Sequence, residues 1–243
     1  VNLFLLGTIV NRLLGWPLWI ALVVAAVIVL SYITLGGLTA AIYNEVLQFF
    51  VIVAALLPLT IIGLNRVGGW EGLKERVSSD GMLGAEQLSS WPGEQLSGFS
   101  NPVLSVVGIV FGLGFVLSFG YWTTNFVEVQ RAMASKSINA ARLTPILGSF
   151  PKMLIPFIVI IPGMISAVLV TQMTQFKQIA STVDEATAIE QTGVTYNDAL
   201  LLLMREVLPN GLLGIAIAGL LAAFMAGMAA NISAFNTVFS YDL

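Results

Sequence analysis

Long stretches of this chain carry no charged residue, and short polar connections separate them. The longest uncharged runs are 13–44, 95–127, 153–176 and 207–241. A helix needs about 20 mainly apolar residues to cross the hydrocarbon layer of a bilayer, which is about 30 Å thick. These runs therefore predict membrane-spanning helices.

The first run is too long for one span, and glycine and proline divide it. Gly15-Trp16-Pro17 and Gly36-Gly37 stand where turns are expected. We therefore predict a partial helix ending near Leu14, a helix from Pro17 to about Leu35, and a third from Thr39 to about Leu64.

The other three runs each have a proline near the predicted helix start. Proline suits the first turn of a helix, where its missing N–H leaves no hydrogen bond unmade. The starts are expected at Asn101-Pro102, near Pro145 and at Pro209-Asn210. With these, we predict about six membrane segments, forming a single transmembrane domain over residues 1–243.

The charges in the connections predict the orientation of the spans. Residues 131–152 hold four basic residues and no acidic one, and such loops lie on the cytoplasmic side. We expect 66–100 and 174–208, each with five acidic residues, to be extracellular loops. Alternation then places the Gly36-Gly37 turn inside. It also places Arg12 outside, although basic residues are enriched on the cytoplasmic side.

Composition agrees with a membrane protein and excludes most other classes. Hydrophobic residues make up 57% of the chain, charged residues 9%, and the mean hydropathy is +0.92. The chain has no cysteine and no histidine, which excludes disulfides, thiolate chemistry and imidazole metal sites. We expect neither an enzyme, nor a bound metal or cofactor, nor a nucleic-acid partner.

Glu45 is the one ionisable residue in a long apolar stretch. A carboxylate at mid-bilayer costs roughly 2.5–3.5 kcal/mol, so such a residue faces a water-filled route or a partner. A second reading places Glu45 at the cytoplasmic end of its helix, where water and the helix N-terminus accept its charge. The sequence leaves both open.

The fourth segment combines glycines with a polar cluster. Gly108, Gly112, Gly114 and Gly120 precede Tyr121-Trp122-Thr123-Thr124-Asn125. A break near 119–124 is plausible, and broken helices are how many transporters build a substrate site. Alternatively, the Gly108 and Gly112 pair forms a close-packing face for another helix.

The last span has small residues on one helical face. Ala216, Gly219, Ala223, Ala226 and Ala230 recur at spacings of three and four residues. Such a face predicts a contact seam against another helix.

Four strings resemble motifs of the sodium:solute symporter family, close to its sodium/glucose cotransporter branch. They are Leu35-Gly36-Gly37-Leu38 with Ala41–Gln48, Tyr121-Trp122 with Val129-Gln130-Arg131, Ile161–Ser166, and Leu208–Leu212. They occur in the family's order from about residue 20 to residue 242. The resemblance implies a partial leucine-transporter-type inverted-repeat helical bundle, covering about core helices three to eight of a longer protein.

The resemblance also implies a function. The chain would belong to a secondary active transporter that moves a small, sugar-like solute by alternating access, with sodium as coupling ion. By resemblance, Tyr121 is the inner gate, Trp122 supports it, and Ser118 and Lys152 contact the solute or the gate. The partners would be the solute, the cation and the lipid of a plasma or bacterial inner membrane.

The cation route departs from the family pattern. Glu45 aligns with an acidic residue on the sodium release path. Ala226 and Gly227 align with two ligand positions that are hydroxyl residues in sodium-coupled members, and their side chains offer no oxygen to a hard cation. Two alternatives therefore stay open: a sodium-independent or proton-coupled carrier, and a transporter-like solute sensor.

Overall fold

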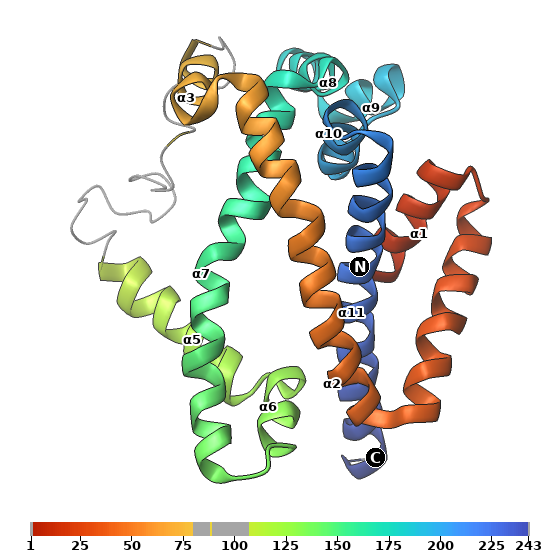
Figure 1. Cartoon of the computed structure of the whole chain (residues 1–243), viewed down its shortest axis with the longest axis vertical. Helices are drawn as coiled ribbons and strands as arrows, with labels where there is room; N and C mark the ends of the chain where they lie inside the picture. The colour runs from red at the N-terminus through yellow and green to blue at the C-terminus, as the bar shows by residue number, and fades with distance from the viewer. Residues whose placement is uncertain (1, 80–87, 89–106, 243) are drawn as a thin grey trace.

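In the computed structural model the chain is a bundle of helices (Figure 1). The structure describes residues 2–79, 88 and 107–242, and these contain no strand. The helices are α1 (Asn2–Leu14), α2 (Leu18–Val67), α3 (Gly69–Ser79), η2 (Gly108–Gly114), α5 (Phe115–Thr123), α6 (Phe126–Met133), α7 (Ile138–Leu169), α8 (Thr171–Thr182), α9 (Glu185–Thr192), η3 (Tyr196–Asp198), α10 (Ala199–Val207) and α11 (Asn210–Asp242).

Within the described residues, three helices are long and apolar enough to cross a membrane, namely α2, α7 and α11. A fourth candidate is the bent pair Gly108–Thr123 and Phe126–Met133. The 50-residue α2 is two arms, because Gly37 interrupts it with φ 59° and ψ −156°. This left-handed backbone favours glycine, which has no Cβ. The predicted division at Gly36-Gly37 is therefore confirmed.

The turns and ends of the bundle gather at its two poles. Figure 1 places the Gly37 turn of α2, the connection from α6 to α7 and the C-terminus at the bottom, and α3, α8, α9 and α10 at the top. This arrangement is the one that the predicted alternation requires. The assignment of the lower pole to the cytoplasm stays a prediction.

The connections between spans are more helical than we expected. The stretch 66–100 contains α3, and 174–208 contains most of α8 together with α9 and α10. The predicted start of the fifth span near Pro145 is wrong, because α7 begins at Ile138. There the Ser137 hydroxyl accepts a hydrogen bond from the Ala140 N–H at 3.2 Å, which caps the helix one turn after α6. Most of 131–152 is thus helix.

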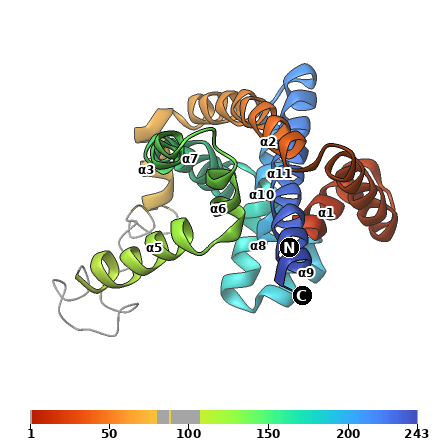
Figure 2. The same cartoon turned by 90° about the horizontal axis from the view of Figure 1, so that it is seen from below.

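The small face of the last span packs against α2. A Cβ at Gly219 would lie 2.3 Å from the Cβ of Ala55 and 3.0 Å from the carbonyl oxygen of Val51, so only glycine allows this approach. Ala216 on the same face is fully buried. Both views show α11 beside α1 and α2 (Figures 1 and 2). The predicted contact seam is confirmed.

The upper pole is tied to α1 and α2 by two arginines. The Arg12 Nη2 donates to the carbonyl oxygen of Gly193 at 2.7 Å, and its Nε lies 3.7 Å from Oδ1 of Asp198. Arg66 donates to the carbonyl oxygens of Glu206 and Val207 at the end of α10. The Asp198 carboxylate and the exposed carbonyls explain an arginine at the acidic pole.

Candidate functional site

The fourth span is broken where the sequence predicted a break. α5 ends at Thr123 and α6 begins at Phe126, with an angle of 47° between the two pieces. The Thr124 hydroxyl donates to the carbonyl oxygen of Gly120 at 2.7 Å, and the Asn125 Oδ1 accepts from the Val127 N–H at 3.2 Å. The Asn125 side chain thus satisfies an N–H group at the start of α6, and the Thr124 hydroxyl adds to the backbone N–H groups of Thr124 and Asn125 that also donate to Gly120.

The alternative reading of the glycines as a packing face finds no support in the described residues. A Cβ added at Gly108 or at Gly112 would have no neighbour within 4 Å. These glycines instead belong to η2, a π-helical stretch that leads into α5. π-helical turns mark functional sites more often than packing seams.

Three of the four predicted solute or gate residues meet beside the break. The Tyr121 and Trp122 rings stand edge to face, with centroids 5.5 Å apart and planes at 85°. From α7, the Lys152 Nζ lies 4.0 Å from the Tyr121 ring centroid and 4.6 Å from that of Trp122. Ser118 is exposed on α5, and no described contact joins it to the cluster.

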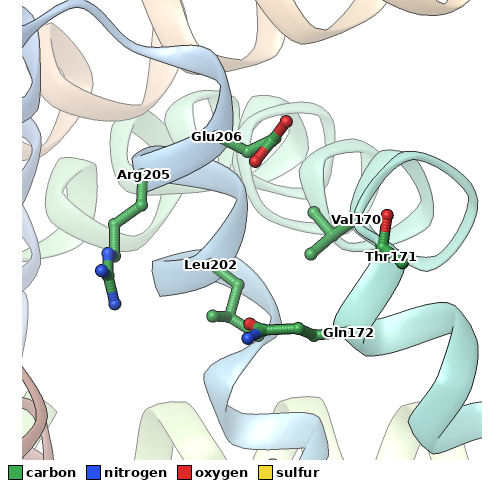
Figure 3. A pocket seen from close by; sticks show the side chains of 6 residues that line it. All are labelled: Val170, Thr171, Gln172, Leu202, Arg205 and Glu206. Carbon is green, nitrogen blue, oxygen red and sulfur yellow. The ribbon is translucent and has the colours of Figure 1, made fainter.

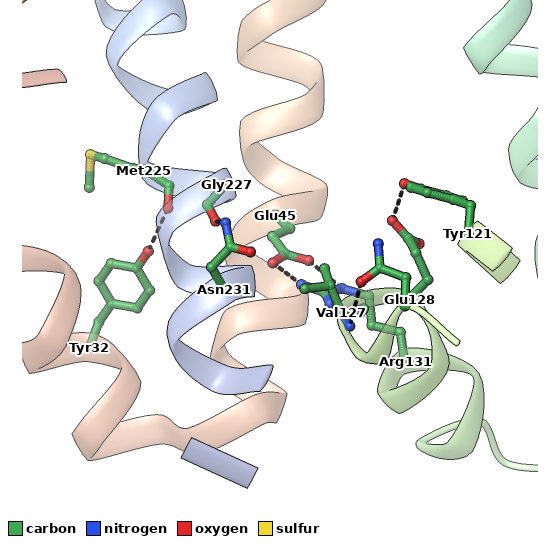
Figure 4. A network of polar contacts seen from close by, with 10 residues as sticks. Tyr32, Glu45, Tyr121, Val127, Glu128, Arg131, Met225, Gly227 and Asn231 are labelled. Atoms are coloured by element: carbon green, nitrogen blue, oxygen red, sulfur yellow. Dashed lines mark hydrogen bonds and ion pairs between the residues drawn. The ribbon is translucent and has the colours of Figure 1, made fainter. Parts of the chain in front are cut away.

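Glu128 is a fourth member of this cluster, which the sequence analysis missed. The Tyr121 hydroxyl donates a hydrogen bond to Oε1 of Glu128 (Figure 4). Glu128 lies seven residues after Tyr121, across the break. Its signal in the sequence is that it is the one acidic residue between the polar cluster and the basic stretch 131–152.

Glu45 is bound by an arginine, so the reading with a partner is the one the structure supports. Arg131 Nε donates to Oε2 of Glu45 at 2.9 Å, and its Nη2 donates to Oε1 (Figure 4). The Glu45 side chain is 20% exposed and the Arg131 side chain 18%. Glu45 stands eight residues beyond Gly37, which at 1.5 Å per residue is about 12 Å above the lower pole. It therefore lies inside its helix rather than at its end.

Ala226 and Gly227 lie half-buried on α11, close to two amide side chains. A Cβ at Gly227 would lie 2.4 Å from Nδ2 of Asn2 on α1. One turn later, the Asn231 Nδ2 donates to the carbonyl oxygen of Gly227 at 2.8 Å (Figure 4). Two amide groups therefore lie against the backbone of α11 at Gly227.

A family comparison decides how these features belong together. The model of the sodium:solute symporter family matches residues 1–243. The chain belongs to the sodium:solute symporter family. This membership and the long apolar helices make it an integral membrane protein of a transporter family, not of an enzyme family.

Curated relatives are cotransporters of sodium with sugars. The chain is 30% identical to the sodium/mannose cotransporter of Bos taurus over its whole length and covers 41% of that protein. It is 27% identical to the sodium/glucose cotransporter of Vibrio parahaemolyticus over 99% of this chain and 43% of that protein. Sodium/glucose cotransporter 1 of Mus musculus is also 27% identical, over 96% of this chain and 36% of that protein. The chain spans about two fifths of the curated relatives it matches.

Two cavities flank the membrane part of this symporter-family chain. One of about 310 Å³ lies between α8 and α10 at the upper pole, lined by Val170, Thr171, Gln172, Leu202, Arg205 and Glu206 (Figure 3). Another of about 490 Å³ opens near the lower pole between α2, α6 and α11, and Gln130 and Met133 line it. In the described residues no three acidic side chains cluster as a metal site would require.

Proposed function

We propose that the chain forms the gate and part of the solute site of a symporter that moves a small, sugar-like organic solute across the membrane by alternating access. The observation that carries the proposal is the cluster of Tyr121, Trp122 and Lys152 at a broken span. The names of the relatives, which pair sodium with mannose or glucose, support a sugar-like solute.

The chemistry of the cluster suits a small polyol. An aromatic face binds the C–H surface of a sugar, while a few polar groups orient its hydroxyls. The break at Thr124 and Asn125 brings backbone dipoles to the same place, as in other transporters. Tyr121 is then the ring that separates a bound solute from the cytoplasm, and Lys152 is a donor to a solute hydroxyl.

Sodium is the coupling ion that we propose, because the chain's family and its relatives are sodium-coupled. The amide side chains of Asn2 and Asn231 meet Gly227 through their Nδ2 atoms, and we propose their Oδ1 atoms as the hard donors that substitute for the missing hydroxyls. Entry of one positive charge down a membrane potential supplies about 2.3 kcal/mol per 100 mV. Glu45 would lie on the release path of the cation.

The orientation follows from the charges. We propose that the stretch 131–152 is cytoplasmic, and that 66–100 and 174–208 face the outside of a plasma or bacterial inner membrane. Reaction of introduced cysteines with an impermeant thiol reagent from either side of intact cells tests this. Labelling at the Gly37 turn from outside would contradict it.

Uptake of labelled glucose and mannose by the natural full-length protein in proteoliposomes tests the function. An inward sodium gradient should drive accumulation that an equal potassium gradient does not. Equal uptake under both gradients would favour a sodium-independent or proton-coupled carrier, to which the Ala226-Gly227 pair points. Binding of a sugar without any uptake would contradict transport and favour a solute sensor.

A further inference from the structure

The hydrogen bond from Tyr121 to Glu128 bridges the break in the fourth span. Tyr121 belongs to α5 and Glu128 to α6, and the two helices meet at 47°. The other bonds at the break are short-range ones: the backbone N–H groups of Thr124 and Asn125 donate to the carbonyl oxygen of Gly120, as does the Thr124 hydroxyl, and the Asn125 side chain accepts from the Val127 N–H. The Tyr121 hydroxyl is therefore a direct tie between the two halves of the broken helix (Figure 4).

Tyr121 is held by three groups of different kinds. Trp122 meets its ring edge to face, the Lys152 ammonium lies over the ring, and Glu128 accepts from the hydroxyl. The first contact does not depend on charge. The third contact does depend on charge, because the Glu128 carboxylate is only an acceptor when it is ionised and carries an O–H of its own once it binds a proton.

The two carboxylates near the break differ in their partners. Glu45 on α2 is engaged at both oxygens by Arg131, so binding a proton there would break an ion pair. Among the described residues Glu128 has no ion pair with a lysine or arginine within 4.0 Å. The charged groups facing this region are Lys152 from α7, Arg131 from α6 itself and Glu45 from α2. Glu128 is thus able to bind a proton without losing an ionic partner.

We propose that Glu128 is the positioning residue of the Tyr121 gate, and that proton binding at Glu128 loosens the gate. This inference rests on the proposed function, because it takes Tyr121 as the gate. A hydrogen bond to an ionised carboxylate is about twice as strong as one to a neutral acceptor. The ionised Glu128 therefore holds the Tyr121 hydroxyl firmly, and the neutral carboxyl holds it weakly.

A cysteine at Gly148 reports on the gate. A Cβ at this position on α7 would lie 3.8 Å from the Trp122 ring and touch nothing closer. The described chain has no cysteine of its own, so any elsewhere in the full-length protein are replaced by serine. The measurement is the rate at which a maleimide labels Gly148→Cys, in otherwise wild-type protein and in Glu128→Gln, Tyr121→Phe and Glu190→Gln backgrounds.

The same cysteine serves in every background, so ratios of rates cancel its own titration. Relative to Glu128→Gln, the wild type should label about fivefold more slowly near pH 8, and the two rates should converge as the pH is lowered. Tyr121→Phe, which lacks the donor, should behave like Glu128→Gln at every pH. Glu190→Gln, the same substitution on exposed α9, should behave like the wild type.

Three outcomes would overturn the inference: identical wild-type and Glu128→Gln profiles, a wild-type rate that falls further below the Glu128→Gln rate as the pH is lowered, or an unchanged wild-type profile in Tyr121→Phe. Melting temperatures of all variants in detergent show whether each one folds. The labelling needs no solute. If the wild type takes up neither glucose nor mannose, the proposed function fails while the labelling still decides the role of Glu128.

Discussion

Arg131 on α6 binds Glu45 on α2 through two of its nitrogen atoms, although the two residues are 86 positions apart. The same short helix carries Glu128, which accepts from Tyr121. α6 therefore joins the aromatic cluster to the bundle at two points. A movement of the gate and a change at the ion pair are expected to affect each other through this helix.

Replacing one partner of the ion pair should destabilise the protein. Glu45→Gln leaves Arg131 without its counter-charge, and we expect a loss of about 2 kcal/mol, below the 3–5 kcal/mol of a fully buried pair because both side chains keep partial exposure. The double variant with Arg131→Gln should regain part of the loss. Melting in detergent measures both. Equal stability of the Glu45→Gln variant and the wild type would show that the pair contributes nothing.

The same variant tests the cation route. Glu45→Gln should change the cation dependence or the pH dependence of uptake more than the preference between glucose and mannose. Uptake assays with sodium, potassium and varied pH measure this. Unchanged cation and pH profiles would remove Glu45 from the route and leave it a structural role.

Tyr121→Ala should abolish or strongly reduce sugar uptake while the protein still inserts into the membrane. The change removes both the ring that Lys152 covers and the hydroxyl that donates a hydrogen bond to Glu128. Tyr121→Phe is the matched control, because it keeps the ring and should retain more uptake than alanine. Normal uptake by Tyr121→Ala would contradict the placement of the gate.

A hydroxyl on the last span should strengthen sodium dependence. Ala226→Ser supplies one oxygen donor, whereas a side chain at Gly227 would first have to displace Asn2. We therefore expect greater sodium stimulation of uptake in Ala226→Ser than in Ala222→Ser, which places the same hydroxyl one turn earlier. No difference between the two variants would mean that this position does not contact the cation.

The seam between α2 and α11 should tolerate no side chain at Gly219. Gly219→Ala forces apart Ala55 and the backbone at Val51, and overpacking of this kind costs about 1–3 kcal/mol. Gly214→Ala on the same helix meets nothing within 4 Å and should be neutral or slightly stabilising. Melting temperatures compare the pair. Equal values would place the close approach elsewhere.

Asp184 should make the start of α9 sensitive to acid. Its carboxylate accepts from the backbone N–H of Thr187 at 2.7 Å and from the Thr187 hydroxyl, and these bonds hold the pKa of Asp184 below its ordinary 3.8. A lowered folded-state pKa gives stabilisation that is fully present above the unfolded-state pKa of 3.8 and lost as the pH falls through the folded-state pKa. Hydrogen exchange at the Thr187 amide should therefore accelerate only in strong acid. In Asp184→Asn, which keeps a capping oxygen, that acceleration should disappear.

Several features of the fold were open to prediction because they depend on local sequence. The division of α2 follows from Gly37, and the break after α5 follows from the polar residues that satisfy its backbone. The predicted start of α7 near Pro145 is too late, because the preference of proline for the first turn of a helix does not exclude it from later turns. Ser137 caps α7 eight residues before Pro145, and four prolines lie inside the helix.

The sequence by itself determined that this is a membrane protein of the symporter family. It also determined where the long apolar stretches are interrupted and which connection is basic, since hydrophobic length, charge and motifs are local properties. Only the tertiary structure decided which charges and rings meet. Four basic residues near the lower pole were equally possible partners for Glu45, and nothing in their spacing selected Arg131. The packing of α6 against α7 and α11 selected it, and placed Glu128 at the Tyr121 hydroxyl and Lys152 over the ring.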